Sequence, residues 1–249
     1  MDCAFFIYEH ISKQFDELAL KSLKSFLNLN LNIHIYCFYK NEINNKLKIS
    51  DKIIFKNIDI YNFDNLHYVN TSKYNHIVDL ISFKLLALSI LKKQYDKVIY
   101  FDLDVIFRKD FSYIIKSLNN SYIYGCNEYS RKYIASNRCL VLRDAKISLN
   151  QYINAGFMIW CLDFEFDIED YKNYIKKFFV DCPEQDYINF KFKNYIKVLP
   201  NYISWNPLLD FEYNPACVHF LGEFKPYKLT KNMIKNFKLE KFIKEYLKI

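Results

Sequence analysis

Glycine is scarce in this chain, which has only three glycines among its 249 residues. A chain with so few glycines is expected to keep them where the backbone turns tightly or approaches a ligand closely. A simple turn is the commoner role of any single glycine, so both interpretations stay open for Gly125, Gly156 and Gly222. Two of the three lie beside polar residues that suit ligand contact.

Paired cysteines are also lacking. The seven cysteines are odd in number, scattered and without any C-x-x-C pair, which argues against a disulfide framework and against a structural zinc site. The N-terminal sequence MDCAFFIYEH lacks the pattern of a secretory leader. No apolar run approaches the roughly 20 residues needed to span a bilayer. The sequence therefore predicts reduced thiols in a soluble, cytoplasmic protein.

Most of the chain lacks an excess of either charge. The net charge of +7 is concentrated in the tail, where eight lysines from Lys225 onward accompany two glutamates. A nearly neutral body argues against a nucleic-acid-binding face. The segment at about 228–249 also carries an apolar stripe at helical spacing, made by Met233, Ile234, Phe237, Phe242, Ile243 and Tyr246. Such a helix either lies on anionic lipid at the inner face of a membrane or packs on the body with its lysines in solvent, and the sequence leaves both open.

Short apolar runs alternate with helical patterns, which predicts an α/β fold with a mixed, mostly parallel sheet flanked by helices. Strands are expected at Cys3–Tyr8, Ile33–Phe38, Ile53–Phe55, Val98–Phe101, Tyr122–Cys126, Ile153–Leu162, Ile196–Leu199 and Val218–Phe220. Helices are expected at Phe15–Leu27, Ser82–Leu91, Phe111–Leu118 and Ile168–Val180, with another starting at Glu184. Asn57–His76 and Arg131–Leu149 are interpreted as loops, the second as a candidate cover for a site. No linker is visible, so residues 1–249 are predicted to form one domain.

Two carboxylates follow the apolar run at 98–101. Asp102 and Asp104 flank Leu103, and two unpaired buried carboxylates would be costly, so at least one must meet water, a cation or a hydrogen-bond donor. Ligands bind at the carboxyl ends of strands in α/β sheets. Two hard oxygen ligands there suit Mg²⁺ or Mn²⁺, which in turn suits a substrate diphosphate. An ordinary pair of carboxylates at a turn is the alternative.

A histidine and a lysine near the C-terminus could complete such a site. His219 follows the apolar stretch ACV, and Lys225 comes six residues later. Imidazole binds Mn²⁺, and two aspartates with one histidine make part of an octahedron. Lys225 could supply charge for a diphosphate. A core histidine and a surface lysine remain the alternative for each residue taken alone.

Four blocks together resemble glycosyltransferase family 8, the retaining GT-A group that includes glycogenin and bacterial lipopolysaccharide galactosyl- and glucosyltransferases. The blocks are YDKVIYFDLDV, INAGFMIW, Glu184-Gln185-Asp186 and HFLGEFKPY, and they lie between Tyr95 and Tyr227. They are similar to the family's D-x-D strand, N-A-G strand, D-Q-D helix start and H-x-x-G-x-x-K-P-W motif. The resemblance implies a GT-A fold.

The resemblance also implies a role for each matching residue. Metal ligands would be Asp102, Asp104 and His219, holding Mn²⁺ (or Mg²⁺) against the diphosphate of a UDP-sugar. Donor contacts would come from Tyr8, Glu9, Lys84, Asp102, Leu103, Asp104, Gly222 and Lys225. Asn154 and Asp186 would hold sugar hydroxyls. Gln185 would lie near the anomeric carbon on the face opposite the leaving group.

The resemblance further implies retaining transfer. Retaining glycosidases use a carboxylate nucleophile, whereas the family has a glutamine at that place, which favours internal return with attack from the leaving-group face. Two positions depart from the family pattern, because Glu184 replaces the usual Asp and Tyr227 the usual Trp.

The expected function is transfer of galactose or glucose from a UDP-sugar to a saccharide or glycolipid acceptor, in surface glycan or lipooligosaccharide assembly. A nucleotidyltransferase is one alternative, because it also pairs carboxylates with a metal. A non-catalytic nucleotide-sugar- or glycan-binding module is the other.

Overall fold

The computed structural model describes residues 1–61, 78–128, 146–177, 183–209, 212 and 214–249. Most of the loop interpreted at 57–76, and the part of the loop at 131–149 that precedes residue 146, therefore lie outside the described residues. The five cysteines in the described part of the chain are free, buried thiols.

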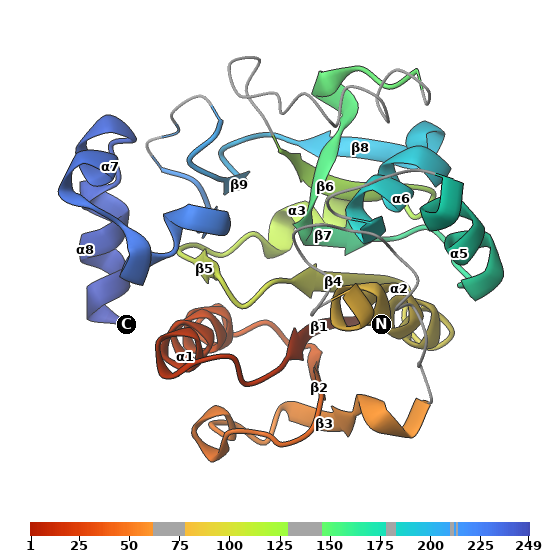
Figure 1. Ribbon diagram of the computed structural model, residues 1–249, viewed down its shortest axis with the longest axis horizontal. Coiled ribbons are helices and arrows are strands. Elements are labelled where there is room, and N and C mark those ends of the chain that lie inside the picture. The colour runs from red at the N-terminus through yellow and green to blue at the C-terminus, as the bar shows by residue number, and fades with distance from the viewer. Residues whose placement is uncertain (62–77, 129–145, 178–182, 210–211, 213) are drawn as a thin grey trace.

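A seven-stranded sheet forms the centre of the molecule (Figure 1). Its strands are β1 (Asp2–Tyr8), β2 (His34–Tyr39), β3 (Ile53–Asn57), β4 (Lys97–Phe101), β6 (Ile123–Asn127), β7 (Ile153–Trp160) and β8 (Ile196–Leu199), in the order β3-β2-β1-β4-β7-β6-β8. β7 runs antiparallel to both of its neighbours, and the other pairs are parallel. The predicted mixed, mostly parallel sheet is confirmed.

Helices cover both faces of this sheet: α1 (Lys13–Leu27), α2 (Val78–Lys92), α3 (Ser112–Ser117), α5 (Ile168–Lys177) and α6 (Pro183–Lys191). Two further helices, α7 (Lys231–Asn236) and α8 (Glu240–Lys248), pack in a cluster apart from it. Strand residues alternate between the two faces: Phe5 packs with the cluster that contains α2, α5 and α6, whereas Phe6 packs with the cluster that contains α1 and α3. This alternation follows from the two-residue period of a strand.

A small second sheet brings strands from the C-terminal part of the chain next to the segment that follows β4. It joins β5 (Val105–Phe107), β10 (Cys217–His219) and β9 (Ser204–Trp205) in the order β5-β10-β9. β5 and β9 are not predicted from the sequence, because runs of three and two residues are too short to show the two-residue hydrophobic period of a strand. The antiparallel pair of Val105 with His219 matters most, since it places His219 beside the aspartates.

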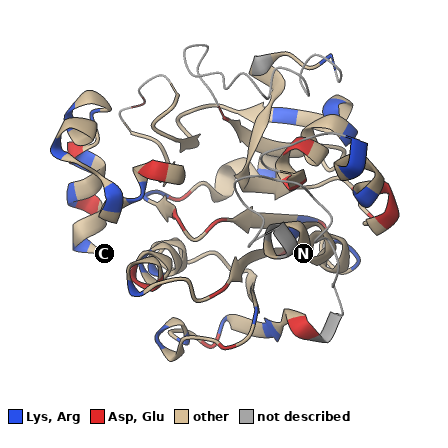
Figure 2. Cartoon of the chain, in the orientation of Figure 1, with Lys and Arg blue, Asp and Glu red and all other residues tan. Residues whose placement is uncertain are grey.

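The tail helices pack against the body of the molecule. α7 and α8 stand at the opposite end from α5 and α6 (Figure 1). Phe242 and Tyr246 of the apolar stripe are buried in a cluster with Leu18 and Trp205. Arg108 donates hydrogen bonds to Glu245 of α8. The apolar stripe therefore faces protein, whereas Lys231, Lys235, Lys244 and Lys248 are exposed. Figure 2 colours the lysines of both helices blue.

Membrane-spanning helices were searched for in the part of the chain that the structure describes. No helix there is both long enough and apolar enough to cross a bilayer.

Candidate active site

The site begins where β4 ends. The Asp102 backbone N–H donates to the Gly156 carbonyl at 2.7 Å, which extends the β4–β7 ladder by one step, and the Val105 N–H donates to the Asp102 carbonyl at 3.0 Å, closing a turn. From β1, the chain adds β2 and β3 on one side of the strand and then β4 on its other side. The strand order of the sheet therefore reverses between β1 and β4. Ligands in open α/β sheets bind at such a reversal, next to the carboxyl ends of the strands.

Three predicted metal ligands come together at this place. One ligand atom from each of Asp102, Asp104 and His219 lies within 4.8 Å of the others. His219 Nε2 is 3.1 Å from Asp104 Oδ1 and 3.8 Å from Asp102 Oδ2. Asp104 Oδ1 is buried and receives no hydrogen bond. A buried carboxylate oxygen without a donor, next to a second carboxylate and an imidazole, fits a divalent cation such as Mn²⁺.

Gly156 makes room for this cluster. A Cβ atom at this position would lie 2.1 Å from His219 Cε1 and 2.8 Å from Asp102 Oδ2. Of the two roles left open for this glycine, the structure shows close approach: the ligand side chains occupy the space that any other residue would fill.

Lys225 contacts the same cluster, with its Nζ atom 2.6 Å from Asp104 Oδ2. Burial alone would raise the pKa of Asp104, but the Lys225 ammonium and the His219 imidazole hold that pKa below its ordinary value. Burial likewise opposes the charge of Lys225, yet Asp104 raises the pKa of the ammonium above its usual range. The site is therefore built to keep both groups ionised.

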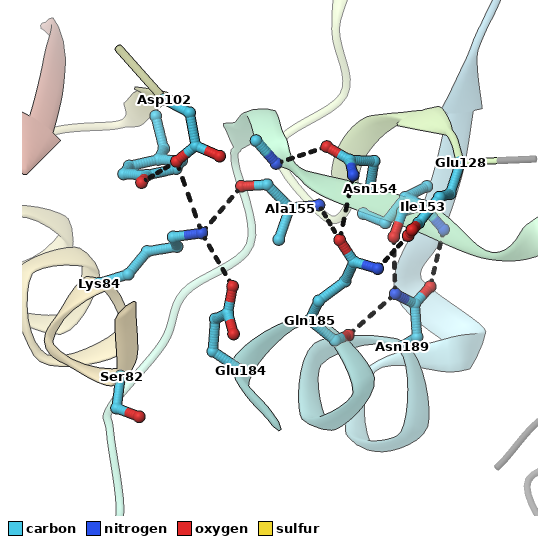
Figure 3. Close-up of polar contacts among 12 residues, drawn as sticks. Ser82, Lys84, Asp102, Glu128, Ile153, Asn154, Ala155, Glu184, Gln185 and Asn189 are labelled. Carbon is cyan, nitrogen blue, oxygen red and sulfur yellow. Dashed lines mark hydrogen bonds and ion pairs between the residues drawn. The ribbon is translucent and has the colours of Figure 1, made fainter. Parts of the chain in front are cut away.

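Lys84 is a buried cation that lies beside Asp102 (Figure 3). Its Nζ atom, on α2, lies 3.2 Å from Glu184 Oε1, 3.1 Å from the Ala155 carbonyl and 4.0 Å from Asp102 Oδ1. Tyr100 donates its hydroxyl hydrogen to Asp102, and burial, with Asp102 close by, raises the pKa of this phenol well above its ordinary value. Lys84 thus links the first turn of α6 to the end of β4.

Gln185 and Asn154 face each other across β7 and α6. Gln185 Oε1 accepts from the Ala155 backbone N–H at 2.9 Å and from Asn154 Nδ2 at 3.2 Å. Asn154 Oδ1 accepts in turn from the Gly156 N–H at 2.7 Å. Gln185 Nε2 donates to Glu128 and, at 3.0 Å, to the Tyr152 hydroxyl.

Asp186 lies deeper than its neighbours. It is 0% exposed, and Tyr152 donates a hydrogen bond to its Oδ1 at 2.5 Å. Direct contact between Asp186 and a sugar hydroxyl stays a prediction.

The remaining predicted donor contacts lie in different settings, and the structure does not bring Tyr8 or Glu9 into contact with the metal cluster among the described residues. Tyr8 is fully buried at the end of β1 and donates to Asp16 at 3.0 Å, while the next residue, Glu9, is half-buried. Leu103 belongs to the core beneath the turn. Gly222 has φ +57° and no heavy atom within 4 Å of where a Cβ would lie. Its backbone conformation is one that glycine adopts without strain.

Sequence reasoning missed four polar residues of this site. Glu128, Tyr152, Tyr100 and Asn189 all make hydrogen bonds within it. Tyr100 is two residues before Asp102, and Glu128 is two residues after the predicted strand Tyr122–Cys126, so both positions carried a weak signal. Tyr152 and Asn189 show their role only after β7 and α6 have been brought together.

Comparisons with known proteins address the fold and the family. A family model described as Glycosyl transferase family 8 matches residues 7–230. A search of curated protein sequences finds no match.

Solved glycosyltransferases are similar in structure to this chain. A galactosyltransferase, LgtC, in complex with donor and acceptor sugar analogs is 14% identical, with 96% of this chain and 94% of that chain covered and a TM-score of 0.67. Mouse xyloside xylosyltransferase 1 is 11% identical over 88% of this chain and 97% of its own, with a TM-score of 0.61. GlyE of Streptococcus pneumoniae TIGR4 is 13% identical, with 99% of this chain but 60% of that chain covered and a TM-score of 0.62.

These similarities confirm the predicted fold and family. The seven-stranded sheet with its flanking helices is a GT-A fold. Because the family model spans most of the chain, including every block that carried the resemblance as far as Tyr227, this protein belongs to glycosyltransferase family 8.

Proposed function

We propose that this glycosyltransferase moves a hexose, galactose or glucose, from a UDP-sugar to a saccharide acceptor with retention of anomeric configuration. The observation that carries the proposal is the grouping of Asp102, Asp104 and His219 within 4.8 Å at the end of β4. Hard oxygen ligands with one imidazole suit Mn²⁺ or Mg²⁺. When bound, such an ion acts as a Lewis acid on diphosphate oxygens.

Two lysines supply the protein's own positive charge around the leaving group. Lys225 is on the segment that follows Gly222 and contacts Asp104, and Lys84 Nζ lies 4.0 Å from Asp102 Oδ1. Both are largely buried, so their charges act on a diphosphate with little screening by water. No heavy atom lies within 4 Å of where a Cβ of residue 222 would be, so a phosphate could approach the backbone closely there.

Polar atoms between α6 and β7 would hold the sugar. Glu184 Oε2 is buried and has no hydrogen-bond partner, although Glu184 Oε1 is held by Lys84. A buried acceptor without a donor suits a sugar hydroxyl. Asn154 Nδ2 uses one hydrogen for Gln185, which leaves a second for the donor sugar. Asp186 would act in this part of the site through Tyr152.

The solved relatives support the class of reaction and leave the sugar to experiment. LgtC is a galactosyltransferase that has been solved with donor and acceptor sugar analogs, whereas the mouse relative is a xylosyltransferase. We place this chain's activity in surface glycan or lipooligosaccharide assembly in the cytoplasm, with a saccharide or glycolipid acceptor. Since the apolar stripe of α7 and α8 is turned inward, contact with a membrane would use the lysines of these helices.

Calorimetric titration with UDP, in Mn²⁺ and in EDTA, tests the metal site. Asp104→Asn removes a charge from the cluster and is expected to weaken Mn²⁺-dependent UDP binding about 10- to 100-fold. Asp163→Asn, at a fully exposed carboxylate, is the matched control. Equal Mn²⁺-dependent UDP binding by wild type and D104N would refute the proposal that Asp104 is a metal ligand.

The two alternatives predict different products. A nucleotidyltransferase would release pyrophosphate where the proposed enzyme releases UDP. A binding module would bind the nucleotide-sugar and turn over none, with or without an acceptor.

A further inference from the structure

The side-chain amide of Gln185 has all of its hydrogen-bonding positions filled by the chain. Figure 3 shows Asn154, Ala155 and Glu128 around it. An amide offers two acceptor positions on oxygen and two donor hydrogens on nitrogen. Ala155 and Asn154 take both positions on Oε1, at 2.9 and 3.2 Å. Glu128 and Tyr152 take both hydrogens of Nε2.

Two of these partners determine which way the amide points. The Ala155 backbone N–H can only donate, and an ionised carboxylate such as that of Glu128 can only accept. Turning the amide over would set N–H against N–H at Ala155 and oxygen against carboxylate at Glu128. Gln185 and Glu128 are only 4% and 5% exposed, so water cannot replace the lost partners.

The backbone holds Glu128 in place for this contact. Glu128 follows β6 just after an irregularity in the β6–β7 register between Gly125 and Asn127. Such irregularities re-aim side chains at the end of a strand. The Glu128 N–H donates to the Tyr152 carbonyl at 3.4 Å, and Asn206 Nδ2 donates to the Glu128 carbonyl at 3.4 Å.

We propose that Glu128 is a positioning residue of the transfer reaction, whose carboxylate fixes the Gln185 amide with its oxygen turned toward Ala155 and Asn154. The fixed amide in turn holds the Asn154 side chain, because Asn154 Nδ2 donates to Gln185 Oε1 beside the place proposed for the donor sugar. This inference rests on the proposed function.

An exchange of the two side-chain types tests the contact. Q185E alone sets two carboxylates against each other in a buried place, where both cannot be ionised, so one pKa must rise. Activity is expected to be lost at about pH 8 and partly regained toward about pH 5, because a shared proton replaces the amide hydrogen. The double variant E128Q/Q185E exchanges donor and acceptor, and it should recover at least about tenfold over Q185E at neutral pH.

Variants of Glu128 alone separate positioning from simple loss of structure. E128Q keeps an acceptor oxygen and should retain most of kcat, whereas E128A should lose about 10- to 100-fold in kcat with a smaller change in KM. Glu165, an exposed carboxylate, provides the controls E165Q and E165A.

The thermal unfolding midpoint gives a readout that needs no turnover. The midpoint of Q185E should rise relative to wild type as pH falls, and the double variant should follow wild type. This pattern without turnover of any UDP-sugar would defeat the proposed function while supporting the contact. The proposal is overturned if the double variant is as inactive as Q185E, or if the Q185E midpoint follows wild type at every pH.

Discussion

Replacing Gly156 by alanine tests the geometry of the metal cluster with the smallest change the chain allows. The new Cβ would lie 2.1 Å from His219 Cε1. Carbon atoms in contact are about 3.5 Å apart or more, so the ring must retreat by roughly 1.4 Å. β7 is buried along its whole length and paired on both sides, so the strand cannot move to relieve the clash. His219 must therefore leave the position in which it faces Asp104.

Both stability and metal binding should respond. Overpacking of a buried site costs roughly 1–3 kcal/mol of unfolding free energy. Displacing His219 should weaken Mn²⁺ binding by about 10- to 100-fold or more, since even groups that only orient a ligand have effects of that size. Mn²⁺ titration followed by electron paramagnetic resonance measures the affinity, and thermal denaturation measures the stability.

Gly125→Ala is the matched control. A Cβ at Gly125 would lie 2.8 Å from Ile153 Cδ1, so it crowds the core and not the metal cluster. G125A should therefore lose stability while binding Mn²⁺ as wild type does. If G156A, folded, binds Mn²⁺ with wild-type affinity, His219 is not a ligand and the geometry argued above is refuted.

Three further predictions concern α8 and Lys84. Glu245→Gln should lower the unfolding free energy by about 1–2 kcal/mol at neutral pH, as measured by urea denaturation. The hydrogen bond from Arg108 lowers the pKa of Glu245, so its contribution is present above the ordinary pKa of 4.5 and is lost as pH falls through the folded-state value, where E245Q and wild type should converge. Phe242→Ala should cost about 3–5 kcal/mol by the same measurement, because its ring is 2% exposed; a loss under 1 kcal/mol would mean that α8 is not docked. Lys84→Met should raise KM for the UDP-sugar without weakening Mn²⁺ binding, since Lys84 neutralises Glu184 and contacts no other part of the metal cluster than Asp102; a weaker Mn²⁺ affinity would contradict this.

Local patterns predicted most of the fold. The strand predicted at Val98–Phe101 and the helix predicted at Phe15–Leu27 differ from β4 and α1 by only one or two residues at their ends. Both were predictable because their apolar residues recur with the period of the element that buries them in the core. β5 was missed because three residues show no period, and its partner β10 lies more than 100 residues later in the chain. The pairing of Val105 with His219 is a tertiary fact that no local pattern contains.

In the site, too, local sequence patterns identify single residues, whereas contacts between residues far apart in the chain are visible only in the structure. Asp102 and Asp104 could be found from their place after a strand, and their grouping with His219 agrees with that prediction. The bond between Glu128 and Gln185 could not, because it depends on the re-aimed end of β6 meeting the first turn of α6. Gln185 could be found through the block Glu184-Gln185-Asp186, but nothing in the sequence pairs it with Glu128.

UDP release from a panel of UDP-sugars, in Mn²⁺ and in EDTA, tests the central claim most directly, with Asp102→Asn as the site variant and Asp163→Asn as the exposed control. The account predicts slow hydrolysis of UDP-galactose or UDP-glucose by wild type and the control, faster with a saccharide acceptor, and abolished by EDTA and in D102N. Turnover that survives EDTA and D102N, or no binding of UDP in the presence of Mn²⁺, would contradict it.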